Sequence, residues 1–299
     1  MATTLCLGTV QFGQDYGIAG QKQPSLDYCV DCLDYATQNG ISAIDTAEAY
    51  GTAQTVVGAF LKKRTLPRER LTLSTKFLPN ALDEVRAEDY ERVIRKRLTE
   101  SLKILHTDYV DAYLFHSARY VFQPEMMEAM HSMVKEGLTR EVGVSVYEPE
   151  EALACLSDKR TGLTQFPYSI FDQRMKRASV FEKAKESHCR VDTRSAFIQG
   201  LLLLEEKQVP SFLGAARPIL KRLKQLSVGS GFSRVALAMA YVKRESAISH
   251  LVFGVDSLEQ LKEDIETFRQ EVPEDVLSEL DEEFADLKAD IVMPSLWKK

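Results

Sequence analysis

The sequence predicts an α/β fold, a parallel (β/α)8 TIM barrel that forms a single domain over residues 1–299, with extra helices after the seventh and eighth strands. Short apolar runs typical of buried parallel strands recur along the chain, with amphipathic helical patterns between them. No linker rich in Pro, Gly or Ser divides the chain, and a barrel of this kind accommodates 299 residues in one domain.

Eight apolar runs are the predicted strands, because each is short, bounded by polar residues and followed by a helical pattern. In chain order they cover residues 4–10, 42–46, 71–77, 110–116, 141–146, 163–166, 190–195 and 250–255. Several of the helices begin at Ser or Pro, which are frequent at helix starts. The helices of the repeating units are expected at 25–39, 53–63, 87–105, 124–136, 149–158, 175–187 and 257–269.

Extra helical segments distinguish the end of the chain from the repeating units. Residues 213–226 and 234–244 predict two helices between the last two strands, and residues 273–287 predict one more after the eighth unit. An open doubly wound sheet is the structural alternative, but it usually carries Gly-x-Gly-x-x-Gly after its first strand. The first strand here leads into Gly8-Thr9-Val10-Gln11-Phe12-Gly13, which favours the barrel.

Composition narrows the class of protein. The net charge of −6 gives no basic footprint for nucleic acid, and no apolar stretch is long enough to span a membrane. The five cysteines are an odd number without a disulfide framework, so we expect reduced thiols and a cytoplasmic protein. Cys29 and Cys32 have the spacing of a redox or zinc half-site, but no second pair follows and a structural role is favoured; no metal site is predicted.

Four ionisable side chains lie where predicted strands end. Asp45 closes the second strand, Tyr50 follows it, Lys76 ends the third strand and His116 ends the fourth. Active sites of parallel barrels lie at the carboxyl ends of the strands, so we expect all four at one mouth.

These side chains suit the delivery of a proton to a carbonyl oxygen. A phenol, with an ordinary pKa of about 10, needs a cation nearby to stabilise its phenolate, and Lys76, held by Asp45, is expected to lower that pKa. His116 can donate a hydrogen bond to the substrate oxygen. Since no side chain supplies a hydride, a cofactor must do so.

Five segments of the chain resemble, in order, those typical of the aldo-keto reductase family, from residue 5 to about 270. They are Leu7-Gly8-Thr9, Asp45-Thr46-Ala47-Glu48-Ala49-Tyr50-Gly51, Ser74-Thr75-Lys76, the run 109–116 that ends in His116, and Gly143-Val144-Ser145. The resemblance implies a catalytic tetrad of Asp45, Tyr50, Lys76 and His116 with Tyr50 as general acid, and an NADPH or NADH cofactor bound without a Rossmann domain.

The resemblance also implies the residues that bind this cofactor. Ser145 and Gln165 are expected at the nicotinamide carboxamide, and the segment 194–201 at the pyrophosphate. The full set implied is Gly8, Thr9, Asp45, Ser145, Gln165, Arg194, Ser195, Phe197, Gln199, Gly200, Gly254, Asp256, Gln260, Glu263 and Asp264.

Three departures from the family pattern carry expectations of their own. Val146 replaces the usual Asn, and Arg194 replaces a Tyr that often stacks on the nicotinamide; its guanidinium could stack there or bind a substrate anion. Asp256 and Gln260 occupy places where basic residues would bind a 2′-phosphate, so NADH use stays open although the family leans to NADPH.

The substrate is expected to be a small carbonyl compound, such as a polar or anionic sugar derivative. The residues expected to contact it are Val10, Gln11, Tyr50, His116, Arg119 and Trp297. An epimerase that keeps its NAD, and a redox-sensing binding subunit that turns over slowly, are the alternative functions. Neither the oligomeric state nor the direction of the reaction follows from the sequence.

Overall fold

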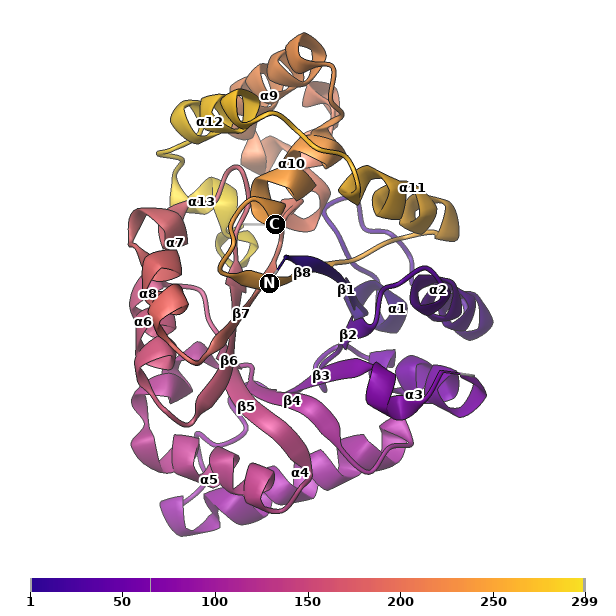
Figure 1. Cartoon of the computed structure of the whole chain (residues 1–299), viewed down its shortest axis with the longest axis vertical. Coiled ribbons are helices and arrows are strands. Elements are labelled where there is room, and N and C mark those ends of the chain that lie inside the picture. Colours follow the sequence, from indigo (N-terminus) through magenta and orange to yellow (C-terminus); the bar gives the residue numbers. More distant parts are fainter. Residues whose placement is uncertain (1, 65, 298–299) are drawn as a thin grey trace.

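The computed structural model describes residues 2–64 and 66–297 and contains a closed parallel barrel whose strands follow one another in chain order. Figure 1 shows the ring of strands with helices around it. The strands are β1 Thr4–Gly8, β2 Ala43–Asp45, β3 Thr72–Phe77, β4 Val110–Phe115, β5 Thr139–Ser145, β6 Thr161–Pro167, β7 Arg190–Arg194 and β8 Ile248–Phe253. The predicted (β/α)8 fold is confirmed.

Pairing between the first and last strands closes the barrel. Leu5 of β1 pairs with Leu251 of β8, and both strands run in the same direction. Because every strand has two partners, no exposed sheet edge remains.

Thirteen α-helical segments are present in the described residues. They are α1 Val10–Gly13, α2 Leu26–Gln38, α3 Ala53–Lys63, α4 Tyr90–Leu105, α5 Pro124–Lys135, α6 Pro149–Ser157, α7 Arg174–Arg177, α8 Val180–Glu186, α9 Ala216–Ser230, α10 Arg234–Lys243, α11 Leu258–Phe268, α12 Glu274–Glu283 and α13 Ala289–Val292. No helix in the described part of the chain is long and apolar enough to cross a membrane.

Alternation along β4 shows how the sequence fills two cores. Ala112 and Leu114 form a small buried cluster with Leu163 of β6, on the inside of the barrel. Tyr113 and Phe115 belong to the large cluster between strands and helices. Successive strand residues point to opposite faces, and both faces of a barrel strand are buried, so the run is apolar throughout.

The differences from the predicted elements lie mainly at their ends. The helix predicted at 175–187 is two helices, α7 and α8, because Ser179 between them has a left-handed φ of 54°. The helix predicted from residue 87 begins at Tyr90, after a 3-10 turn. Strands β5 and β6 each begin two residues earlier than predicted, since Thr139 pairs with Val110 and Thr161 pairs with Val142.

The cysteine pair in α2 has a structural environment. Cys29 and Cys32 are both fully buried as free thiols, and burial raises their pKa to about 12 and about 11. A thiol that keeps its proton is a poor nucleophile and metal ligand, which agrees with the structural role favoured from the sequence.

Candidate active site

A cavity of about 670 Å³ opens at the carboxyl ends of the strands. Asp45 ends β2, Lys76 lies next to the end of β3, and His116 directly follows β4. Since β2, β3 and β4 are neighbours in register, the strand ends bring these side chains to one side of the mouth. Tyr50 joins them from the loop between β2 and α3.

Lys76 is fully buried and paired. Its Nζ lies 2.7 Å and 2.6 Å from the two carboxylate oxygens of Asp45 and donates to the Thr46 carbonyl at 3.3 Å. Burial lowers the pKa of Lys76, but the charge and hydrogen bonds of Asp45, together with the contribution of Tyr50, more than offset this, so the pKa lies above its ordinary value. The lysine therefore carries its positive charge into the floor of the cavity.

The Tyr50 hydroxyl lies 3.5 Å from Lys76 Nζ, on the side that faces the cavity. Burial raises the pKa of Tyr50, and the Lys76 charge opposes this without overcoming it. The sequence argument expected the Lys76 charge to lower this pKa, and it does so, but the desolvation of the phenolate is the larger effect and the net shift is upward. The group is a neutral phenol that can donate a proton.

His116 is an uncharged imidazole beside the tyrosine. Its ring lies 5.6 Å from the Tyr50 ring, edge to face. Burial, together with the charges of Lys76 and Arg194, lowers the pKa of His116 to about 3. At neutral pH it therefore has one N–H to donate and one nitrogen to accept.

The loop that carries Tyr50 is held from two sides. Gly13 of α1 packs so closely that a Cβ there would lie 1.8 Å from the Tyr50 carbonyl oxygen, and its own carbonyl accepts from Thr52 at 3.0 Å. On the other side, the Glu48 carboxylate accepts from Arg97 and from the Tyr113 hydroxyl, each at 3.1 Å. These contacts fix where the phenol points.

Buried polar atoms without partners lie below the cavity. Gln165 donates from Nε2 to Asp45 at 3.0 Å, but its Oε1 has no hydrogen-bond partner among the described residues, and neither has Ser145 Oγ. A buried oxygen or hydroxyl left unpaired costs free energy, so a polar ligand at this place would relieve that cost. An amide has the donor and acceptor that these two atoms need.

The loop after β7 forms a wall with unusual backbone. Ser195, Ile198, Gln199 and Gly200 all have positive φ, between 47° and 92°. Successive left-handed and right-handed residues turn backbone N–H groups toward a common point, an arrangement that suits anions such as phosphate.

The chain matches the model of the Aldo/keto reductase family over residues 4–283. The chain belongs to this family. It is accordingly an NAD(P)H-dependent oxidoreductase.

Named relatives are similar over most of their length. The protein tas of Escherichia coli K12 is 26% identical, with 93% of each chain covered, and an NADH-specific methylglyoxal reductase of the same organism is 26% identical, with 79% of this chain and 81% of the relative covered. The holo form of an aldo-keto reductase from Bacillus halodurans superposes with a TM-score of 0.77 at 21% identity, covering 99% of this chain and 95% of that one.

Most of the residues that the sequence assigned to the reductase site line the cavity. They are Gly8, Thr9, Val10, Gln11, Asp45, Tyr50, His116, Arg194, Ser195, Phe197, Gln199, Gly200, Gly254, Asp256 and Gln260. Lys76, Ser145 and Gln165 are fully buried and outside the lining; Lys76 and Gln165 contact Asp45, which lines the cavity, and Ser145 pairs with Gln165 in the sheet.

Four expected residues of the reductase lie elsewhere. Arg119 is exposed on the loop after β4 and pairs with Asp83, outside the cavity lining. Trp297 is buried, and its Nε1 donates to the Ile291 carbonyl, so the neighbours Pro294 and Ser295 face the cavity instead. Glu263 is exposed on α11 and Asp264 is buried within it, and neither lines the cavity.

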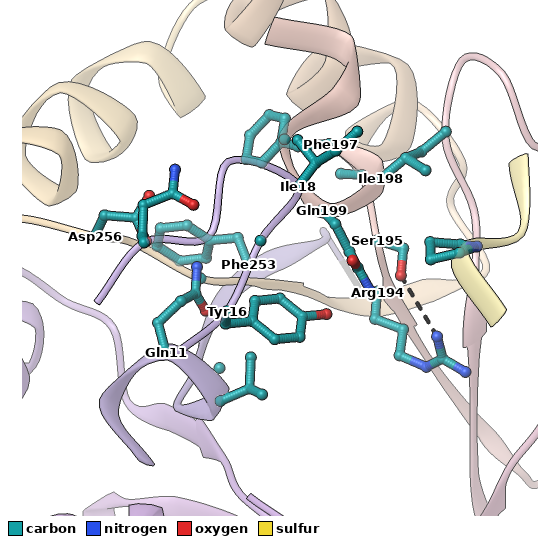
Figure 2. A pocket seen from close by; sticks show the side chains of 18 of the residues that line it. Gln11, Tyr16, Ile18, Arg194, Ser195, Phe197, Ile198, Gln199, Phe253 and Asp256 are labelled. Atoms are coloured by element: carbon teal, nitrogen blue, oxygen red, sulfur yellow. Dashed lines mark hydrogen bonds between the residues drawn. The ribbon is translucent and has the colours of Figure 1, made fainter. Parts of the chain in front are cut away.

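Two tyrosines that sequence reasoning missed also line the reductase cavity. Tyr16 comes from the loop after β1, and in Figure 2 its hydroxyl points across the cavity toward the side of Arg194. Tyr147 follows the end of β5. Both lie in loops at the carboxyl ends of strands, which is the signal that could have found them.

The Tyr16 loop crosses the cavity of the reductase and meets the wall after β7. Ile18 donates its backbone N–H to the Gln199 carbonyl at 3.0 Å, and Tyr16 and Gln21 pair as an isolated bridge. Two loops that lie about 180 residues apart in sequence thus cover the cavity together.

Proposed function

We propose that the chain reduces an aldehyde or ketone to an alcohol, with Tyr50 as the general acid. The contact between the Tyr50 hydroxyl and a lysine charge that Asp45 holds in place carries the proposal. A neutral phenol gives up its proton more readily when a cation stabilises the phenolate that results. The buried position excludes water, which strengthens this electrostatic effect.

His116 would position the carbonyl. Its depressed pKa keeps the imidazole neutral, so it can donate an N–H to the carbonyl oxygen while Tyr50 protonates the same atom. Asp45 orients Lys76 and also accepts from Gln165, which links the proton donor to the floor of the site.

The residues present fit a nicotinamide cofactor. When bound, it supplies the hydride that no side chain can provide. Ser145 and Gln165 would hold its carboxamide through the two unpaired atoms in the floor, the segment 195–200 its phosphates, and Gly254, Asp256 and Gln260 its adenosine end. The family resemblance also assigns Glu263 and Asp264 to the adenosine end of the cofactor. Because neither lines the cavity, they would influence cofactor binding only through neighbouring residues.

NADH is the cofactor that the charges favour. Among the described residues that line the cavity, Arg194 is the single Lys or Arg, and it lies beside the catalytic side chains. At the other end, the exposed Asp256 carboxylate would repel a 2′-phosphate and could accept from a free 2′-hydroxyl. A relative described as an NADH-specific methylglyoxal reductase supports this preference.

The test is the oxidation of NADH and of NADPH, measured separately over a panel of aldehydes and sugar derivatives. We expect turnover with NADH in preference to NADPH, and a fall in kcat of at least about 100-fold in Tyr50→Phe with NADH binding unchanged. Tight retention of NAD through purification, without net turnover, would instead favour the epimerase. Cofactor binding without turnover, and without tight retention of NAD through purification, would favour the redox-sensing subunit.

A further inference from the structure

Arg194 is the last residue of β7 and lies opposite Pro167 at the end of β6. The strand end directs its side chain to the mouth of the barrel, where it lines the cavity with Tyr50 and His116. It is partly buried, and among the described lining residues no other Lys or Arg is present. A positive charge therefore lies at the catalytic end of a cavity that contains the neutral His116.

The guanidinium of Arg194 is held in place without being neutralised. Its plane lies over the Tyr147 ring, with Cζ 4.4 Å from the ring centre. Nη2 donates to the Val146 carbonyl at 3.3 Å and Nη1 to Ser195 Oγ at 3.4 Å, the contact drawn in Figure 2. No carboxylate of the described residues forms an ion pair with it, although Arg174, nearby in sequence, pairs with both Asp172 and Glu148.

A guanidinium has five N–H donors, and only two are engaged here. Leaving a partly buried cation unpaired costs free energy, and stacking on an aromatic ring recovers part of it. The remaining donors match the two oxygens of a carboxylate, which arginine binds in a fixed planar geometry. The Tyr16 hydroxyl, on the facing side of the cavity, offers a further donor.

We propose that Arg194 binds an anionic group of the substrate, and that the reductase acts on oxo acids and carboxy-aldehydes. This rests on the proposed function. In the reaction the carbonyl carbon accepts a hydride and its oxygen accepts the Tyr50 proton, while NADH is oxidised and the carboxylate stays unchanged. Arg194 is thus a substrate-binding residue that determines specificity.

The cofactor phosphates are the other source of an anion in such a cavity. Two observations favour the substrate. Arg194 lines the same cavity as Tyr50 and His116, and its charge lowers the pKa of both groups. The loop 195–200, with positive φ at Ser195, Ile198, Gln199 and Gly200, also lines the cavity and is a separate candidate for binding phosphate.

The experiment compares 4-carboxybenzaldehyde with its uncharged methyl ester, methyl 4-formylbenzoate. We expect the wild-type protein to have the higher kcat/KM on the acid, and Arg194→Gln to lower kcat/KM on the acid by 10- to 100-fold, mainly through KM, while the ester changes less than about threefold. Arg194→Lys should restore part of the loss. Arg177→Gln, which removes an exposed arginine paired with Asp286, is the matched control and should change neither substrate.

NADH fluorescence separates the two sources of the anion. If Arg194→Gln raises the Kd of NADH at least tenfold and lowers acid and ester turnover alike, Arg194 binds the cofactor and the proposal is overturned. If neither these two compounds nor any carbonyl compound of the panel is turned over, the proposed function has failed, and binding decides the inference. Calorimetry with 4-(hydroxymethyl)benzoate and its methyl ester should then still show acid binding that requires Arg194, and equal binding of both would reject the anion site.

Discussion

The Asp45–Lys76 ion pair shows how one buried contact serves both stability and chemistry. Removing either partner would leave an uncompensated charge in a floor that solvent does not reach, which typically costs about 3 to 5 kcal/mol. The same pairing keeps the lysine charged beside Tyr50. If the proposed function holds, stability and activity depend on the same two residues, so mutants of either must be checked for folding before their kinetics are read.

Asp264 is a buried carboxyl without such a partner. Its Oδ2 has no hydrogen-bond partner among the described residues, and burial, with the nearby Glu263 charge, raises its pKa to about 7. The unfolded chain releases this proton near pH 4, so the folded state binds one proton more between about pH 4 and 7. The contribution of Asp264 to stability is present below pH 4 and is lost as the pH rises through 7.

We expect Asp264→Asn to raise the free energy of unfolding at pH 8 by about 2 to 4 kcal/mol, with a gain that narrows toward pH 5. Urea denaturation at several pH values measures this. Glu282→Gln, at an exposed position of α12, is the control and should show little change. A gain independent of pH would mean that the carboxyl does not titrate as described.

At the scale of elements, the short helix α1 helps to position Tyr50, the proposed general acid. It lies directly after β1, and its last residue, Gly13, contacts the loop between β2 and α3 where backbone meets backbone. Thr9 adds a second link, since its N–H donates to the Asp45 carbonyl at 2.9 Å. The end of β1 and the loop that follows it thus set the position of groups that belong to the neighbouring unit.

Gly13→Ala should displace this loop, because the added Cβ would lie 1.8 Å from the Tyr50 carbonyl oxygen. We expect kcat to fall by up to about 100-fold through misplacement of the phenol, together with a loss of stability. Steady-state kinetics and thermal unfolding measure both. Gly229→Ala in α9, where nothing lies within 4 Å of the added atom, should leave activity intact. Equal effects of the two substitutions would argue against the contact.

At the scale of the whole molecule, the cavity is closed by segments from both ends of the chain. The loop after β1 meets the loop after β7, and the C-terminal tail adds Pro294 and Ser295 to the lining. The tail is anchored by Trp297, which packs in the main core cluster. The shape of the substrate end therefore depends on a residue that does not face it.

Trp297→Ala should remove a large buried side chain and lower the free energy of unfolding by about 3 to 5 kcal/mol, with a rise in KM because the lining moves. Denaturation and kinetics on one preparation test this. Leu296→Ala, next to it and 49% exposed, should change stability by less than about 0.5 kcal/mol. Unchanged stability with a KM effect on one class of substrate would instead support the direct substrate contact expected from the sequence.

Particular residues show how far sequence reasoning reached. The alternation of apolar runs and helices predicted the eight strands, because burial on both faces forces such runs. Asp45, Tyr50, Lys76 and His116 were found together because the carboxyl ends of neighbouring parallel strands meet at one mouth. Arg119 follows β4 as His116 does, yet its side chain pairs with Asp83 at the surface. Its position in the sequence does not show whether the side chain enters the cavity or turns to the surface.

The sequence by itself determined the barrel, the family and the set of side chains at the strand ends, because these follow from periodicity and local order along the chain. Only the tertiary structure decided the direction of the Tyr50 pKa, the roof formed by Tyr16 and the free guanidinium of Arg194. These properties depend on burial and on contacts between residues that belong to different elements of the fold. Desolvation and through-space charge act on distances in space, which the order of residues does not contain.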